Sequence, residues 1–183
     1  MREHFYITTP IYYVNADPHL GHAYTTILAD SIARYHRLFG KDVFFLTGTD
    51  EHGQKVQAAS LLEKISPQAH CDKMFVRFKE LWDKLGIEYS DFIRTTENRH
   101  KQVVEEILND IHEKGEIYID EFEGWYCIHD ERFFNDKDLH EGNCPLCERP
   151  AQRMREKNYF FKMSKYQQWL IDYINDNPDF IRP

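Results

Sequence analysis

The sequence predicts an α/β fold, in which a parallel sheet wound by helices is followed by a smaller β-rich segment. Two observations lead to this prediction. Residues 1–115 alternate short apolar runs with longer stretches of helical periodicity, the order that is typical of parallel strands joined by helical crossovers. After Gly115 the pattern changes to short strand-like pieces separated by turns. We therefore place a domain boundary near residues 115–119.

The first two strands and the helix between them follow from apolar patterning. A buried strand is expected at residues 5–9, and a second at residues 43–46, because a continuous apolar run is typical of a strand covered on both faces. Between them the apolar residues recur at helical spacing, and Gly40 provides a stop. These apolar residues are Tyr24, Ile27, Leu28, Ile32, Tyr35 and Leu38.

Capping signals locate the next elements. Helices are expected at residues 54–63 and 67–85, the second opened by Ser66 as N-cap and by Pro67 in the first turn. A third strand at 88–95 and a helix at 97–114 complete the alternation. Ligands of such sheets bind at the carboxyl ends of the strands. His19 and Asp50 each follow a strand and should lie on that rim.

The second segment is expected to hold short strands at 117–119, 125–128 and 132–134, an extended stretch up to Phe161, and a helix at 165–175 capped by Ser164. Lys162-Met163-Ser164-Lys165 is interpreted here as the start of that helix.

Composition limits the class of protein. A content of 42% hydrophobic and 15% aromatic residues fits a packed globular chain. No run reaches the roughly 18 apolar residues of a membrane span, and no signal-peptide core follows the N-terminus. We therefore expect a cytoplasmic protein without a membrane partner. The formal net charge of −8 argues against a general nucleic-acid binder.

The segment Pro18-His19-Leu20-Gly21-His22 lies between the first expected strand and the following helix. The free N–H groups of a helix N-terminus favour anions, and a glycine lets a ligand approach the backbone. Two imidazoles three residues apart share one helix face. The segment therefore suits phosphate oxygens, with two ordinary surface histidines as the alternative.

This segment resembles the HIGH signature of class I aminoacyl-tRNA synthetases, with Leu20 in the variable place. Residues 8–15 and 46–54 resemble the methionyl-tRNA synthetase family in particular, and the resemblance runs from Phe5 to the last residue. It implies a Rossmann-like (HUP-type) doubly wound sheet with an inserted β-rich connective domain. On this resemblance, residues 1–116 are the first half of the catalytic domain, and residues 117–183 are an incomplete connective peptide with a zinc knuckle.

Enzymes of this family activate methionine with ATP to methionyl-adenylate and transfer it to tRNA. The resemblance therefore implies ATP with Mg²⁺, L-methionine and tRNA(Met) as partners. The first step depends on positioning and charge stabilisation. The implied site residues are His19 and His22 for catalysis, Asn15, His19, Gly21 and His22 for ATP, and Ile11, Tyr13 and Asp50 for methionine.

Residue chemistry agrees with two of these roles. The carboxylate of Asp50 suits the ammonium of a free amino acid, and the ring of Tyr13 suits a polarisable thioether. The alternatives are a loop aspartate that caps the next helix and an ordinary core aromatic.

Cys144 and Cys147 form half of a zinc site. The other half, Cys-x-x-Cys in many members of the family, reads Cys127-Ile128-His129-Asp130 here. Zinc accepts carboxylate and imidazole ligands, so a structural zinc is expected on Cys127, Asp130, Cys144 and Cys147. Spacing favours Asp130 and ligand softness favours His129, and reduced cysteines without a metal are the alternative.

Lys162-Met163-Ser164-Lys165 resembles the KMSKS signature of the class, but Tyr166 replaces its last serine and the segment comes before the second half of the fold. On this interpretation the chain is an N-terminal fragment without the KMSKS loop or the anticodon-binding domain. We expect it to be inactive in adenylation alone and to contact tRNA mainly through absent regions. The local basic run, at Arg149, Arg153, Arg155 and Lys157, is either a small RNA footprint or a solvated face.

Two other functions remain open at this point. One is a class I synthetase of the same subgroup, for leucine, isoleucine, valine or cysteine, which amino-acid binding would distinguish. The other is a non-catalytic zinc-knuckle interaction module, against which the two imidazoles argue. The sequence has no Gly-x-Gly-x-x-Gly and no Walker A loop, which disfavours an ordinary dinucleotide enzyme or P-loop ATPase.

Overall fold

The structure, a computed structural model, describes residues 2–181. The chain divides into two compact units, Met1–Val103 and Val104–Pro183, and the fourth helix, α4 (Asn98–Glu113), extends from the first unit into the second. The boundary expected from the sequence, between residues 116 and 117, falls between the end of α4 and the next strand and stays a prediction.

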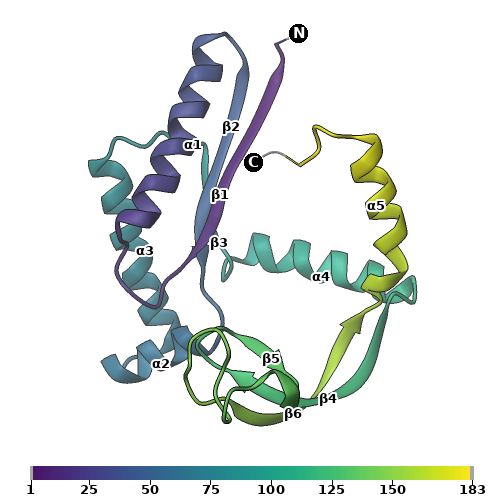
Figure 1. The fold of residues 1–183 in the computed structure, drawn as a ribbon. Coiled ribbons are helices and arrows are strands. Elements are labelled where there is room, and N and C mark those ends of the chain that lie inside the picture. Colours follow the sequence, from purple (N-terminus) through teal and green to yellow (C-terminus); the bar gives the residue numbers. More distant parts are fainter. Residues whose placement is uncertain (1, 182–183) are drawn as a thin grey trace. The chain divides into compact units, whose positions relative to one another are not determined.

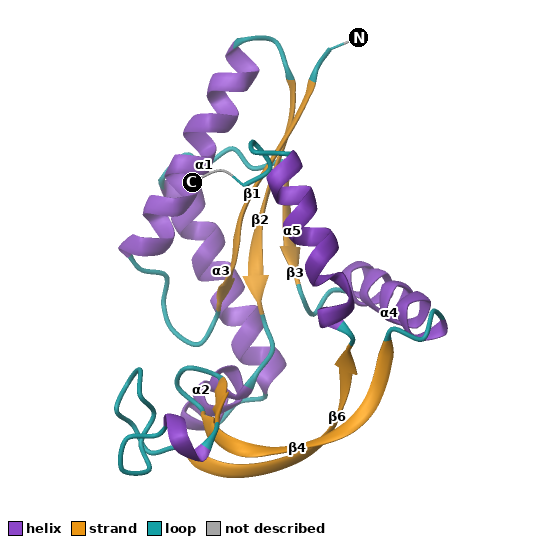
Figure 2. Ribbon diagram, turned by 45° about the vertical axis from the view of Figure 1, so that its right-hand side comes forward, coloured by secondary structure: helices purple, strands orange, loops and turns teal. Residues whose placement is uncertain are grey.

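The first unit is an α/β unit with a three-stranded parallel sheet in the order β1-β2-β3 (Figure 1). The alternation predicted from the sequence is confirmed. Helices α1 and α3 lie on the same side of this sheet (Figures 1 and 2). The elements are β1 (His4–Tyr13), α1 (Leu20–Leu38), β2 (Asp42–Asp50), α2 (Gln54–Glu63), α3 (Pro67–Lys84) and β3 (Asp91–Arg94).

A bulge divides β1 into two halves. Thr8 pairs with Leu46 and Ile11 pairs with Gly48, so three steps along β1 match two steps along β2. The extra residue falls at Thr9-Pro10, where proline has no N–H to donate to the ladder. Because neighbouring side chains alternate between faces, the bulge changes which residues of β1 point toward the helices.

The core of the first unit lies between the sheet and α3. Phe78 and Trp82 of α3 are fully buried with Phe45 of β2 and Val14 beyond β1. Ser66 caps α3 by accepting from the Ala69 N–H at 3.1 Å, as the sequence predicted.

The apolar stripe of α1 is exposed. Tyr24 and Leu38 are 70% and 82% exposed, whereas the buried positions are Ala23, Thr26, Ala29, Asp30 and Ala33. The predicted helix is confirmed, although it begins at Leu20, but the apolar spacing marks the face opposite to the one that packs. Small side chains bring the helix close to the sheet, and Asp30 is buried because its carboxylate accepts from the Glu88 N–H at 2.9 Å and pairs with Arg34 at 2.6 Å.

The expectation that the first two strands are buried is only half correct. Phe45 is fully buried, but its neighbour Phe44 on the opposite face is 46% exposed, and Tyr6 beside it is 60% exposed. A continuous apolar run predicts burial on both faces. In the first unit, α1 and α3 cover the face to which Phe45 belongs.

The second unit holds an antiparallel sheet in the order β5-β4-β6. The two short strands expected at 117–119 and 125–128 are one continuous strand, because β4 pairs with β6 from Ile117–Phe161 to Tyr126–Gln152. The elements are β4 (Ile117–Cys127), β5 (Arg132–Phe134), η1 (Asp136–Asp138), β6 (Gln152–Phe161), η2 (Met163–Tyr166) and α5 (Gln167–Asp176).

The Lys-Met-Ser-Lys segment forms the short helix η2. Ser164 lies inside η2 and does not cap α5, which begins at Gln167 after Tyr166, so the predicted cap is wrong. Lys162 Nζ donates to the Gly115 carbonyl at 2.7 Å, and Lys165 pairs with Glu116. Both ammonium groups are therefore engaged within the second unit, which agrees with a structural interpretation of this segment.

Within residues 2–181, no helix combines the length and the apolar character that a bilayer crossing requires.

Phe78→Ala is expected to destabilise the chain by about 3–5 kcal/mol, because it empties a fully buried site between α3 and the sheet. Urea unfolding followed by circular dichroism measures this change. The matched control is Leu62→Ala on α2, where the side chain is 86% exposed and the expected change is within about 0.5 kcal/mol. Equal effects of the two substitutions would contradict the assignment of the core.

Candidate functional site

The two histidines of the Pro18–His22 segment form the N-terminal cap of α1. His19 Nδ1 accepts from the Gly21 N–H at 3.1 Å, and His22 Nδ1 accepts from the His19 N–H at 3.2 Å. The rings stack with centroids 3.7 Å apart. Because each Nδ1 is an acceptor, a neutral ring carries its proton on Nε2. The cap thus leaves two Nε2–H donors beside a helix N-terminus.

Burial keeps His22 uncharged. Its ring packs against Tyr12, with centroids 4.8 Å apart, and against Phe78, with centroids 5.3 Å apart. Burial lowers the pKa of His22, and the charge of His19 lowers it further. His22 is therefore a neutral hydrogen-bond donor at neutral pH.

Gly21 is required by the histidine ring next to it. A Cβ at this position would lie 3.0 Å from Cε1 and 3.1 Å from Nδ1 of His19. A larger residue would press on this ring, which would have to move by a few tenths of an ångström relative to the Gly21 N–H.

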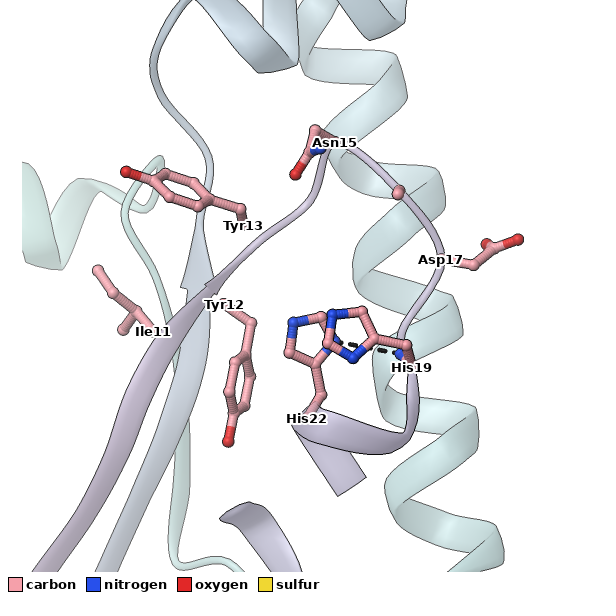
Figure 3. Close-up of a pocket in the computed structure, with 8 residues that line it drawn as sticks. Ile11, Tyr12, Tyr13, Asn15, Asp17, His19 and His22 are labelled. Atoms are coloured by element: carbon pink, nitrogen blue, oxygen red, sulfur yellow. Dashed lines mark hydrogen bonds between the residues drawn. The ribbon is translucent and has the colours of Figure 1, made fainter. Parts of the chain in front are cut away.

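The turn between β1 and α1 lines a cavity of about 340 Å³ (Figure 3). The structure brings Asn15, His19 and His22 together with Ile11 and Tyr13 there. Figure 3 shows Ile11 and Tyr13 on one side of β1 and Tyr12 on the other, next to His22. The complete lining is Ile11, Tyr12, Tyr13, Asn15, Ala16, Asp17, His19 and His22.

Asp50 ends β2 and pairs in register with Tyr13 of β1, while Gly48 pairs with Ile11. Directly paired residues of neighbouring strands point to the same face, so Ile11, Tyr13 and Asp50 share a face at the carboxyl edge of the sheet. Asp50 Oδ1 accepts from the His52 N–H at 3.3 Å. The alternative role of Asp50 as a helix cap is wrong, because α2 begins at Gln54 with Gly53 in the cap position.

Helix α3 holds the turn that carries these residues. The buried His70 bonds through Nε2 to the Val14 carbonyl at 2.8 Å, and Arg77 forms an ion pair with Asp17. Neither His70 nor Arg77 was predicted from the sequence as part of the site. Their spacing of seven places them on one face of the predicted helix, which was the only available signal.

A buried carboxylate behind Asp50 was also missed. Glu51 has a fully buried side chain and pairs with Arg94 at 2.7 Å. The sequence shows the acidic pair Asp50-Glu51 at the end of one strand and Arg94 at the end of the next strand. Only the strand order shows that Glu51 and Arg94 meet.

The second unit brings together the four side chains predicted as metal ligands. The ligand atoms of Cys127, Asp130, Cys144 and Cys147 all lie within 4.8 Å of one another. Asp130 Oδ2 is 3.1 Å from Cys144 Sγ and 3.3 Å from Cys127 Sγ. His129 stays outside this group, with Nδ1 3.2 Å from Asp130 Oδ1. The group can hold a metal ion.

The chemistry of the donors fits a cation. Hydrogen bonding to Asp130 raises the pKa of the Cys147 thiol to about 12, and burial adds to the rise. A bound divalent cation reverses this effect, because a coordinated thiol is deprotonated. Three thiols and a carboxylate are a ligand set that suits tetrahedral Zn²⁺.

Comparison with known proteins points to one family. A family model described as "tRNA synthetases class I (M)" matches residues 5–156. The methionine–tRNA ligase of Fusobacterium nucleatum is 51% identical over all of this chain, which covers 29% of that relative. The methionine–tRNA ligase of Thermotoga maritima is 51% identical over 98% of this chain, again covering 29% of the relative. The chain thus spans less than a third of the length of these relatives.

Solved structures agree with the fold. The methionyl-tRNA synthetase of Mycobacterium tuberculosis in complex with methionyl-adenylate matches 99% of this chain and 36% of its own, with a TM-score of 0.93 and 39% identity. A leucyl-tRNA synthetase of Agrobacterium radiobacter in a ternary complex matches 96% of this chain and 23% of its own, with a TM-score of 0.78. Its 19% identity shows the fold alone. With the family match over most of its length, the chain belongs to the methionine-specific class I aminoacyl-tRNA synthetases.

Proposed function

We propose that this chain forms the ATP- and methionine-binding part of a methionine–tRNA ligase. The reaction activates methionine with ATP to methionyl-adenylate and then transfers the methionyl group to tRNA(Met). The observation that carries the proposal is the pair of Nε2–H donors of His19 and His22, at the same sheet edge as Asp50. The relatives named methionine–tRNA ligase and the relative bound to methionyl-adenylate support it.

The histidine cap is the proposed phosphate site. His19 and His22 donate from Nε2 to phosphate oxygens of ATP, and the free N–H groups at the start of α1 add to the positive potential. Asn15 lines the same cavity and offers an amide to the nucleotide. Gly21 holds the His19 ring in place. Mg²⁺ accompanies ATP and neutralises phosphate charge.

The face shared by Ile11, Tyr13 and Asp50 is the proposed methionine site. Asp50 pairs with the ammonium group of the amino acid through charge-assisted hydrogen bonds. Tyr13 and Ile11 are 41% and 43% exposed on that face, and Lys55 Nζ lies 5.3 Å from the centroid of the Tyr13 ring. An aromatic ring and an aliphatic side chain on one face suit contact with a thioether side chain.

In the activation step, a carboxylate oxygen of methionine attacks the α-phosphorus, and the bond to pyrophosphate breaks as the new P–O bond forms. The protein supplies position and charge stabilisation and forms no covalent bond. His19 and His22 strengthen their hydrogen bonds as negative charge grows on the phosphate oxygens. The Nε2–H groups suit this role because they donate hydrogen bonds without giving up their protons.

We further propose a structural Zn²⁺ on Cys127, Asp130, Cys144 and Cys147. Asp130 is the better fourth ligand, because its carboxylate lies among the three thiols while His129 bonds to the outer oxygen of that carboxylate. Four protein ligands leave no open position, so the metal stabilises the fold of the second unit. Reduced thiols in such a site suit a cytoplasmic protein.

We propose that tRNA is bound mainly by regions that the relatives contain and that this chain does not cover. Arg153 and Arg155 pair across the strands with Glu123 and Glu121. These acidic partners neutralise two of the four residues of the local basic run, Arg153 and Arg155, which favours a solvated face over an RNA footprint.

The first test is methionine-dependent ATP–pyrophosphate exchange by the full-length product of the gene that encodes this chain. His19→Ala and His22→Ala should each lower kcat by about 10²–10³-fold, because each removes a donor that acts in the transition state. The matched control is His4→Ala, whose side chain is 83% exposed and whose loss should leave kcat unchanged. Exchange at the normal rate in both variants would exclude the proposed phosphate site.

The second test uses pH. Because burial lowers the pKa of His22 from its ordinary value of 6.5, the unfolded chain binds more protons than the folded chain as the pH falls below that value. The stability that comes from neutral His22 is therefore present above about pH 6.5 and lost as the pH falls toward the folded pKa. Urea unfolding at about pH 7.5 and about pH 5.5 measures this slope, which should shrink in His22→Gln. An NMR titration of His22 at or above the ordinary value would contradict the assignment.

The third test is zinc content. The purified chain should hold one equivalent of zinc by mass spectrometry, and chelator competition gives its affinity. His129→Ala should weaken binding by roughly 10–100-fold, as loss of an outer-sphere partner does, and Asp130→Ala should weaken it further. Cys71→Ala, outside the group, is the control and should leave the stoichiometry unchanged. A larger loss of zinc affinity in His129→Ala than in Asp130→Ala would indicate that His129, and not Asp130, is the fourth ligand.

A further inference from the structure

Directly behind Asp50 lies a carboxylate that the proposed reaction does not use. Asp50 is half-buried at the rim of the sheet, whereas the side chain of the next residue, Glu51, is 0% exposed. A carboxylate in such a place is strongly unfavourable unless it is paired and hydrogen-bonded. The hydrogen-bond partners of Glu51 therefore show which segments its carboxylate connects.

Three donors converge on Glu51 from two strand ends. Glu51 Oε1 accepts from Thr49 Oγ1 at 2.8 Å and from Arg94 Nε at 2.7 Å. Oε2 accepts from the hydroxyl of Thr96. Thr49 belongs to β2, Arg94 ends β3, and Thr96 follows β3, so one carboxylate fastens the end of β2 to the end of β3.

A threonine fixes the backbone of the same turn. The hydroxyl of Thr95 accepts from the Glu51 N–H at 2.9 Å and lies 2.9 Å from His52 Nδ1. The Thr95 N–H donates to the Thr49 carbonyl at 3.3 Å. Both residues that follow Asp50 are thus tied to β3.

This attachment reaches the Asp50 carboxylate through His52. Asp50 Oδ1 accepts from the His52 N–H at 3.3 Å, and His52 is held by Thr95. The far end of the network is anchored as well, because Arg94 pairs with Asp72 at 2.6 Å and its guanidinium lies 4.6 Å from the centroid of the Phe75 ring. The turn that presents Asp50 is therefore held by β3 and by α3.

We infer that Glu51 is a positioning residue for amino-acid recognition. It fixes residues 50–52 against β3, so that the Asp50 carboxylate is held ready for an ammonium group. The inference rests on the proposed function, because it assumes that Asp50 binds the ammonium. A ligand that already finds its partner in place binds without the cost of ordering it. Loss of Glu51 should therefore weaken the binding of methionine and leave the binding of ATP unchanged.

The test is steady-state exchange kinetics on the full-length gene product with Glu51→Gln, which keeps the shape of the side chain and removes its charge. The KM for methionine should rise at least about tenfold, equivalent to about 1.4 kcal/mol, while kcat and the KM for ATP change by less than about twofold. Glu88→Gln is the matched control. It also removes a carboxylate that pairs with an arginine, Arg34, but is 62% exposed, and it should change none of these constants.

A double-mutant cycle with Asp50→Asn separates positioning from general structural support. If Glu51 acts through Asp50, then Glu51→Gln has no further effect on the methionine KM once Asp50 is replaced. The same tenfold rise in the Asp50→Asn background, or an unchanged KM in Glu51→Gln alone, would overturn the inference. An unchanged methionine KM in Asp50→Asn would instead refute the proposed role of Asp50.

A milder variant keeps the test open if Glu51→Gln does not fold. Thr96→Val removes a single donor to Glu51 with little change of shape. It should raise the methionine KM in the same direction and show the same dependence on Asp50. A folded Thr96→Val protein with unchanged methionine KM would then decide against the inference.

Discussion

The site depends on the bulge that Thr9 and Pro10 introduce into β1. Before the bulge, Ile7 pairs with Phe45 on the helix-covered face, and after it Tyr12 pairs with Thr49 on that face. The extra residue thus turns Tyr12 into the core beside His22 and leaves Tyr13 on the open face beside Asp50. A hydroxyl–hydroxyl contact of 2.8 Å between Thr9 and Thr47 fixes the bulge. Without the bulge, Tyr13 would point into the core and Tyr12 would lie on the open face.

Two features of the candidate site share one principle, which is that each group proposed for recognition is fixed by the backbone. The imidazoles satisfy N–H groups at the start of α1 with Nδ1 and so keep Nε2 for a ligand. The Asp50 carboxylate accepts from a backbone N–H, and Asp50 is only half-buried. Groups held in this way lose little freedom when they bind, and this suits the proposed reaction, which depends on positioning.

The sequence predicted the features that depend on neighbouring residues, and it did not predict those that depend on tertiary packing. The limits of α2 and α3 were predicted because Ser66, Pro67 and the glycines act on their own neighbourhood. The placement of His19 and Asp50 on one rim followed from the rule for parallel sheets. The covered face of α1 could not be predicted, because periodicity identifies an apolar face and does not show what packs on it. Glu51 and Arg94 are 43 residues apart, and only the strand order brings them together.

The bulge also has a consequence for how this region tolerates change. A substitution in the second half of β1 alters one side chain, whereas inserting or deleting one residue there would interchange the two faces of the strand at once. Adaptation of the site should therefore proceed by replacing residues, and the number of residues from Pro10 to Tyr13 should be far harder to alter than their identity.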